Sequence, residues 1–271
     1  MCNHKTNRLY QYTSVDSLLK IIKSKKLRFN NLTLMDDPDE PIAKDFKRAG
    51  RWVFISSWTT KSNNRPMFRE YGDNFKGVCY SLPHYPFFTV FGNPFFKNSK
   101  VMRFNKNGKE LIKPFLYTKG IEEYIGYYDL IFYPYNVECL KVKYTDDPQK
   151  LYPKVANYTY PTRSYYDKEL GIYKDTTWSY QEEIRYRLRP SFLDLDKIGF
   201  IDRNYIGNRM IDTKEYGQCP VSHIDIPIDL TGLEIFIGPA LKGQQRESVL
   251  KKINALCPTA ILKNSSLKIK M

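Results

Sequence analysis

Short strand-like segments and a few helical ones follow each other in no regular order, and this pattern constrains the fold most strongly. Residues 224–229 and 233–238 alternate apolar and polar side chains with period two, as half-buried strands do. Residues 244–256 then place apolar side chains along one side of an amphipathic helix. Because strands occur in both halves without regular alternation with helices, we expect an α+β fold rather than a doubly wound sheet.

The N-terminal half predicts the same mixture. We expect a strand at residues 9–13, a helix with Ser14 as its N-cap, and a strand at residues 27–29. We expect residues 35–40 to form a compact acidic loop that caps a helix containing Ile42 and Phe46. Further strands are expected at residues 52–58, 77–82, 137–144, 182–188 and 260–262, a short helix or turn at 67–72, and a helical or ordered insertion at 150–170.

The composition predicts a packed protein rather than a disordered one. Hydrophobic residues make up 42% and charged residues 27% of the chain, which suffices for a core. The pattern shows no linker and no internal repeat, so we expect a single domain over residues 1–271. The 22 Tyr and 16 Phe are typical of a β-rich core, although some rings could instead stack on bases or on a nicotinamide.

The charge balance points to a polyanionic partner. Lys and Arg number 43 against 29 Asp and Glu, a net charge of +14 that attracts nucleic acid at long range. The alternative is that the lysine content only follows the base composition of an AT-rich genome. The N-terminus lacks an apolar signal region, and no run of about 18 apolar residues occurs, so we expect a cytoplasmic protein without a membrane segment.

Most standard catalytic motifs are absent from the sequence. It contains no phosphate-binding GxxxxGK[ST] loop, no dinucleotide-binding GxGxxG and no GxSxG nucleophile motif. The five Cys form no CxxC pair and the three His are widely separated, so we expect neither a metal site nor a disulfide framework.

One polar segment, residues 178–188, remains as a candidate site. In a strand the side chains alternate between faces, so Gln181, Glu183, Arg185 and Arg187 share one face, while the other is largely apolar. The polar face is either solvated and crossed by an ion pair, or it holds a carboxylate that stabilises a sugar cation. Such a cation forms when a C1′–N glycosidic bond breaks.

The order of several landmarks resembles a known group of proteins. Residues 9–14 and 18–29 look like the opening of ADP-ribosyltransferase-fold toxins, among them DarT-type enzymes and abortive-infection proteins of the AbiGi type. Nearly the whole chain is similar to a large bacterial family with that opening. Its further landmarks correspond here to residues 36–40, 55–58, 67–71 and 77–79, to Trp178 with Gln181, Glu183 and Arg185, and to residues 236–239.

The resemblance implies an ADP-ribosyltransferase-like split β-sheet core with helical insertions, and NAD as co-substrate without a metal. By this resemblance Glu183 contacts the ribose 2′-hydroxyl and stabilises the cationic transition state, and Gln181 orients the acceptor. Gln11 stands where the family has a His or Arg that binds the nicotinamide-side ribose, a departure that leaves one amide donor there.

The same resemblance assigns the NAD-binding residues. Tyr12 and Thr13 lie near the nicotinamide amide, Ser56 belongs to the strand that shapes the crevice, and Trp58 or Tyr71 stacks on the ring. Arg28, Arg69 or Arg185 clamps the pyrophosphate, because a guanidinium matches phosphate geometry.

The resulting expectation is a mono-ADP-ribosyltransferase toxin of the glycosyltransferase class, an anti-phage effector that modifies nucleic acid, with RNA such as mRNA favoured over DNA. Two alternatives stay open: a catalytically inactive module of the same fold that binds a nucleotide or nucleic acid, and an NAD glycohydrolase. An antitoxin or chaperone protein is a further expected partner.

Overall fold

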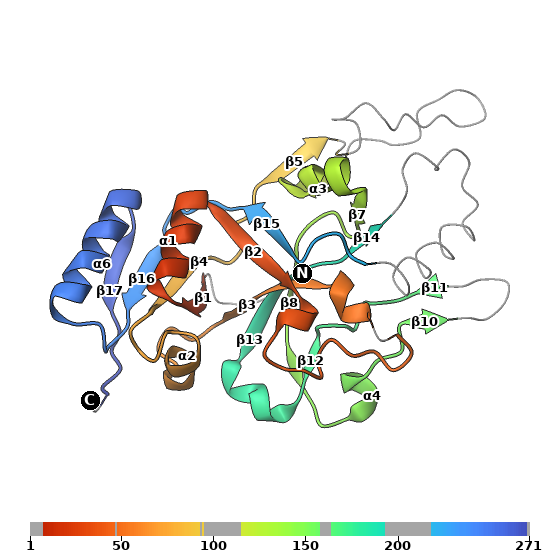
Figure 1. Ribbon diagram of the computed structural model, residues 1–271, viewed down its shortest axis with the longest axis horizontal. Coiled ribbons are helices and arrows are strands. Elements are labelled where there is room, and N and C mark those ends of the chain that lie inside the picture. The colour runs from red at the N-terminus through yellow and green to blue at the C-terminus, as the bar shows by residue number, and fades with distance from the viewer. Residues whose placement is uncertain are drawn as a thin grey trace.

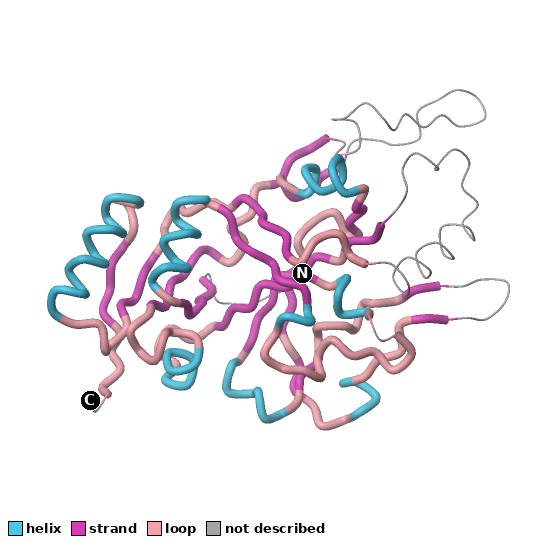
Figure 2. Tube along the Cα trace, viewed as in Figure 1, coloured by secondary structure: helices cyan, strands magenta, loops and turns pink. Residues whose placement is uncertain are grey.

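The computed structural model describes residues 8–46, 48–92, 94, 115–157, 164–192 and 218–269. Within them the protein has an α+β architecture, in which a large mixed sheet is flanked by helices and by smaller two-stranded sheets (Figures 1 and 2). The expected α+β class is therefore confirmed. No helix among these residues is long and apolar enough to cross a membrane.

The large sheet follows one main path with a branch. Neighbouring strands are antiparallel except at its end, where β16 and β17 run parallel. The branch leaves from β3, whose other edge pairs with β13, which in turn pairs with β8. The path runs β15 (His223–Pro227), β2 (Lys26–Asn31), β3 (Phe54–Thr59), β1 (Arg8–Thr13), β4 (Val78–Pro83), β16 (Glu234–Ile237), β17 (Ile261–Asn264), and the branch adds β13 (Glu183–Leu188) and β8 (Glu138–Lys141).

The sheet forks along β3. On one edge, β2 pairs with the beginning of β3, at Phe54 and Ile55, whereas β1 pairs with its last residue, Thr59. On the other edge, β13 pairs with β3 along its whole length. Between the two contacts of the first edge, the carbonyl oxygen of Ser57 accepts a hydrogen bond from the Gln11 side chain at 2.9 Å. An amide side chain thus serves there in place of a strand backbone.

Helix α1 (Val15–Ser24) forms as the sequence predicts. The Ser14 side chain accepts a hydrogen bond from the backbone N–H of Ser17, and the helix ends at Lys25 in a left-handed conformation. Leu18 and Ile22 are buried on its inner face. Helix α6 (Gly243–Leu256) lies beside α1 (Figure 1).

The remaining elements are short and mostly lie around the branch side of the sheet (Figure 2). They are helices α2 (Arg65–Glu70), α3 (Ile121–Tyr128) and α4 (Pro148–Leu151), the 3-10 helices η1 (Leu32–Leu34), η2 (Ala49–Trp52) and η3 (Thr176–Gln181), and the strand pairs β5 (Thr89–Gly92) with β6 (Phe115–Thr118), β7 (Leu130–Phe132) with β14 (Pro190–Phe192), β9 (Lys143–Tyr144) with β12 (Tyr173–Lys174), and β10 (Ala156–Asn157) with β11 (Ser164–Tyr165).

The apolar core packs against the even-numbered face of β13. Tyr186 contacts Trp58 of β3 edge to face, with ring centroids 5.8 Å apart, and Trp58 contacts Tyr80 of β4 at 5.3 Å. Ile184 and Leu188 are buried on the same face of β13. Aromatic side chains therefore join three strands of the sheet, as the Tyr and Phe content predicts for a β-rich core.

Two glycines allow two loops to approach closely. The N–H of Gly238 donates to the carbonyl oxygen of Gly77 at 2.9 Å. A Cβ atom on Gly238 would lie 2.3 Å from the Phe75 carbonyl oxygen, closer than real contacts occur. Larger residues would push the end of β16 away from the start of β4.

Several local predictions are wrong. Residues 41–46 form turns instead of a helix, and Trp52 belongs to η2, so the predicted strand 52–58 begins two residues later. The segment 137–144 is divided between β8 and β9. Residues 150–170 contain only the end of α4 before β10 and β11, so the helical alternative for that segment is wrong. Residues 158–163 of that segment lie outside the described residues.

Candidate functional site

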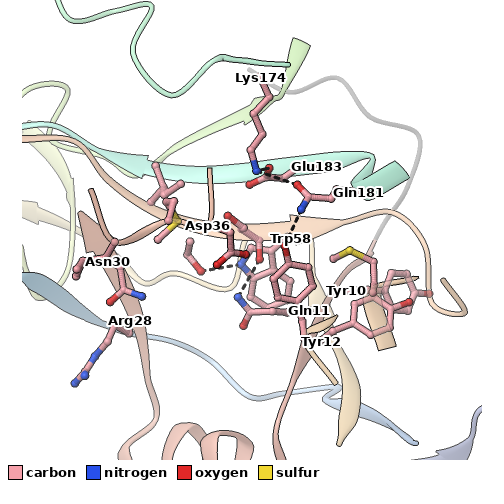
Figure 3. A pocket seen from close by; sticks show the side chains of 17 residues that line it. Tyr10, Gln11, Tyr12, Arg28, Asn30, Asp36, Trp58, Lys174, Gln181 and Glu183 are labelled. Atoms are coloured by element: carbon pink, nitrogen blue, oxygen red, sulfur yellow. Dashed lines mark hydrogen bonds and ion pairs between the residues drawn. The ribbon is translucent and has the colours of Figure 1, made fainter. Parts of the chain in front are cut away.

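A cavity of about 260 Å³ opens at the fork of the sheet (Figure 3). Strands β1, β2, β3 and β13 each contribute residues to its wall, as do the loop after η1 and the end of α2. Its volume lies just below the roughly 300–1,000 Å³ of common ligand pockets. It therefore suits a small ligand or one part of a larger one. The predicted site residues that line it are Gln11, Tyr12, Arg28, Ser56, Trp58, Tyr71, Gln181 and Glu183.

Glu183 is the buried carboxylate of this cavity. It begins β13, and its side chain is only 4% exposed. Arg185 contacts it at two points, with Nε donating to Oε1 at 2.6 Å and Nη2 donating to Oε2 at 3.0 Å. Lys174 Nζ donates to the same Oε2 at 3.3 Å. The polar face predicted from the sequence exists, but it is buried rather than solvated.

A second carboxylate balances these two cations. Glu40 contacts Nη1 of Arg185 through Oε1, and its Oε2 lies 3.9 Å from Lys174 Nζ. All four side chains are buried, and we call Glu40, Lys174, Glu183 and Arg185 the cavity cluster. The formal charges of the cluster sum to zero. Attraction between well-placed opposite charges can therefore offset the free energy that burying them costs.

A chain of hydrogen bonds leads from this cluster across the cavity. Lys174 Nζ donates to Oε1 of Gln181 at 2.9 Å, and Nε2 of Gln181 donates to the Tyr71 hydroxyl at 2.8 Å. Burial, and after it the nearby Asp36 carboxylate, raises the pKa of Tyr71. Figure 3 shows Lys174, Glu183 and Gln181 converging on one side of the cavity, with Asp36 and Gln11 facing them.

The titration behaviour of the cluster reflects its burial. Burial raises the pKa of Glu183, against the opposing effects of Lys174 and of the Ser57 hydroxyl. Burial also lowers the pKa of Arg185, to about 9. Because that value stays above neutral and the two side chains meet at hydrogen-bond distance, we describe them as an ion pair at pH 7.

Gln11 faces the cavity from β1, with its side-chain amide hydrogen-bonded on both sides. Besides donating to Ser57, it accepts a hydrogen bond from the Tyr80 hydroxyl through Oε1. The amide has two N–H groups, so one donor is left for a ligand. The expected single donor at this position is thus compatible with the observed geometry.

Three of the predicted residues in the cavity lining are already engaged in contacts within the protein. The Trp58 ring is buried in the core and donates from Nε1 to the Ser56 hydroxyl at 3.1 Å. The Tyr12 hydroxyl donates to the carbonyl oxygen of Lys61 and accepts from the N–H of Asn64. These contacts leave Tyr71 as the better candidate to stack on a nicotinamide ring.

The predicted pyrophosphate clamp is not assembled in the cavity. Arg185 is completely buried within the cavity cluster, and Arg69 is exposed on α2, outside the cavity lining. Arg28 lines the cavity but points away from Glu183 (Figure 3). Its guanidinium contacts Asp225 at two points, both 2.9 Å. Thr13 also lies outside the lining, because it ends β1 beside Val78.

Sequence reasoning missed several groups that border the cavity. Lys174 carries no local motif, since it precedes Glu183 by nine residues and reaches it only through the pairing of β12 with β9. Asp36 lines the cavity and Glu40 contacts Arg185 behind it, and both belong to the acidic loop that the sequence predicts as a helix cap. Ser57 was passed over for Ser56, although its place opposite Arg185 puts it on the face of Glu183.

In the described part of the chain, no group of three or more His, Cys, Asp or Glu side chains is arranged to hold a metal ion. No family model, curated protein or solved structure matches this chain.

Proposed function

We propose that this protein is an NAD-dependent mono-ADP-ribosyltransferase that acts as a toxin on nucleic acid. The observation that carries the proposal is the position of Glu183. It lies buried at the fork of the sheet, in a cavity that also presents the amides of Gln11 and Gln181 and the Tyr71 hydroxyl. This arrangement supplies a fixed negative charge and hydrogen-bond groups for a ribose and a carboxamide.

In the proposed reaction the bond between C1′ and the nicotinamide nitrogen breaks. The electron pair of that bond goes to the pyridinium ring, which leaves as neutral nicotinamide, and the positive charge passes to the ribose as an oxocarbenium-like centre. Glu183 stabilises this charge, and such preorganised electrostatic stabilisation is the largest single contribution in many enzymes. A nucleophilic oxygen or nitrogen of the acceptor then bonds to C1′ and gives up its proton.

Ser57 shows how the ribose would reach a carboxylate whose oxygens are already engaged. Its hydroxyl lies near Glu183 and lowers the pKa of that carboxylate against the effect of burial, beside the hydrogen bonds from Arg185 and Lys174. A carboxylate has about four acceptor positions, so these neighbours fill it. A ribose hydroxyl can take the place of the Ser57 hydroxyl beside Glu183, because both groups are hydroxyl donors. Arg185 and Lys174 stay in place.

The charge of the protein supports nucleic acid as the acceptor. The net charge is +14, and exposed cations lie near the cavity, namely Arg65 and Arg69 on α2 and the half-exposed Lys61. Cations that contact phosphates give a sequence-independent affinity that falls as salt rises. RNA is the first acceptor to test and DNA the second.

A non-catalytic binding module is the second candidate function. The observation that favours it is that Arg185 and Lys174 already neutralise Glu183 without a ligand. A cavity of this kind could bind a nucleotide and leave its glycosidic bond intact.

The deciding experiment follows the fate of NAD. The protein is incubated with adenine-labelled NAD and with RNA, DNA or neither, beside Glu183→Gln. The matched control is Glu182→Gln, which removes the neighbouring, exposed carboxylate that pairs with Lys61. Circular dichroism checks that each variant folds.

Label on nucleic acid, lost in Glu183→Gln and kept in Glu182→Gln, supports the transferase. Free ADP-ribose without labelled acceptor identifies an NAD glycohydrolase instead. Binding of NAD without turnover under any condition supports the binding module and excludes both enzymatic functions.

A further inference from the structure

Lys174 lines the cavity and contacts several of its side chains, but it has no role of its own in the proposed reaction. It ends the two-residue strand β12 and is 5% exposed. Its ammonium contacts Glu183, Gln181 and Glu40, and it lies 4.7 Å from the centre of the Trp178 ring. A cation buried this deeply is held by its partners and has little freedom to turn elsewhere.

An ammonium group fixes the orientation of the amide beside it. It carries three donors and no acceptor, so only Oε1 of Gln181 can face Lys174. The amide nitrogen of Gln181 must then point the opposite way, toward the Tyr71 hydroxyl and the cavity. Without Lys174 the two amide orientations would differ little, because oxygen and nitrogen have nearly the same size and shape.

The other end of this hydrogen bond is compatible with that direction. A hydroxyl oxygen accepts as well as donates, and the Tyr71 oxygen lies 2.8 Å from Nε2 of Gln181.

We infer that Lys174 is a positioning residue that holds the Glu183 carboxylate and turns the N–H groups of Gln181 toward the ligand. This inference rests on the proposed function. Its consequence is that the cavity recognises a hydrogen-bond acceptor next to Glu183, such as a ribose oxygen or a carboxamide oxygen. One N–H of Gln181 donates to the Tyr71 hydroxyl at 2.8 Å, and the amide nitrogen faces the cavity.

Glu40 makes the inference testable without unfolding the protein. Lys174→Met alone leaves the carboxylates of Glu40 and Glu183 with Arg185 as their single cation. The double variant Lys174→Met/Glu40→Gln restores a neutral cluster of one cation and one anion. Lys174→Arg retains the charge and donors, and Lys143→Met serves as the matched control, because that exposed lysine lies on the neighbouring strand β9 over the Tyr173 ring.

The kinetic test compares NAD turnover of these variants. We expect kcat of Lys174→Met/Glu40→Gln to fall about 10²-fold, as for misplaced catalytic groups, although its melting temperature recovers relative to Lys174→Met. Lys174→Arg should recover part of kcat, and Lys143→Met should match the unmodified protein. Recovery of kcat together with stability in the double variant would show that Lys174 serves only charge balance, and would overturn the inference.

A second measurement does not depend on turnover. The side-chain amide signals of Gln181 are identified in ¹⁵N–¹H NMR spectra by their absence in Gln181→Glu. In the unmodified protein we expect two separate signals, one of them slowed in solvent exchange by its bond to Tyr71. In the double variant the Gln181 amide is free to turn about its Cγ–Cδ bond, so both signals should shift or broaden and the slow solvent exchange should be lost. Unchanged signals would contradict the inference. If the unmodified protein does not turn over NAD but the NMR change occurs as expected, the proposed function is refuted and the positioning role of Lys174 is not.

Discussion

Two buried ionic clusters lie along one face of β13, and they are built differently. The cavity cluster occupies the beginning of the strand, whereas Arg187 and the following Arg189 form a second one with Glu138 and Asp167, which we call the β8 cluster. Each contains two cations and two anions. In the β8 cluster both cations are arginines, and both contact Glu138 at 2.9 to 3.1 Å.

The two clusters differ in the groups to which their cations donate hydrogen bonds. Arg187 donates to the carbonyl oxygens of Lys168 and Leu170, so the β8 cluster fastens β13 to β8 and to the loop before β12. In the cavity cluster, Lys174 donates to Gln181, and that hydrogen-bond chain continues along the cavity wall. Similar charges on one strand thus serve as a fastening at one end and border a candidate binding site at the other.

The largest expected effect is on stability, in the pair Arg185→Met and Arg187→Met. Arg185 is completely buried, and its loss leaves Glu40 and Glu183 with one cation, so we expect a loss of about 3–5 kcal/mol in the free energy of unfolding. Arg187→Met should cost about 1–3 kcal/mol, because Glu138 keeps Arg189 and is partly exposed. Urea unfolding measures both, and equal losses would remove this distinction between the clusters.

The next effect concerns turnover, in the pair Glu183→Gln and Glu138→Gln. If the cavity cluster is the catalytic one, Glu183→Gln should lower NAD turnover by about 10²–10³-fold. Glu138→Gln should change NAD turnover by less than about threefold. The partners of Glu138 are Arg187 and Arg189, which are linked to the cavity residues only through the strand backbone. Initial rates at saturating NAD decide this, and a comparable loss in Glu138→Gln would mean that the rate follows overall stability.

A smaller effect is expected in the coupling between substitutions. Glu40 and Glu183 both contact Arg185, so Glu40→Gln and Glu183→Gln should deviate from additivity by about 0.5–3 kcal/mol. Glu40 and Glu138 contact different cations, so Glu40→Gln and Glu138→Gln should add within about 0.5 kcal/mol. Double-mutant cycles in urea give both numbers. Strong coupling in the second pair would show that β13 joins the clusters into one network.

The smallest effect lies at the rim of the cavity and depends on pH. Burial and the Glu70 carboxylate raise the pKa of Tyr180 from 10.0 to about 12, and its hydroxyl donates to Glu70. The folded-state pKa exceeds the unfolded one, so this contribution to stability is complete below pH 10 and disappears as the pH rises through 12. The melting temperature of Tyr180→Phe should therefore lie slightly below that of the unmodified protein at pH 8 and converge with it in alkali. A pH-independent difference would assign the effect to packing.

Much of the cavity wall could be predicted because its residues lie on regular elements. Gln11, Ser56 and Glu183 belong to strands whose composition and alternation are visible in the chain. Thr13, Arg69 and Arg185 belong to the same or neighbouring segments, yet they lie outside the cavity lining. Sequence position predicts which element carries a residue, but the pairing of strands decides which way the residue faces.

The sequence by itself determined the α+β class, the capped helix after Ser14 and the alternating faces of β13, because these depend on neighbours within a few residues. Only the tertiary structure decided that the polar face of β13 is buried and that Lys174 and Glu40 neutralise it. It also decided that Gln11 completes the fork beside Ser57. These contacts join residues far apart in the chain, and their energy depends on burial, which no local pattern of residue types contains.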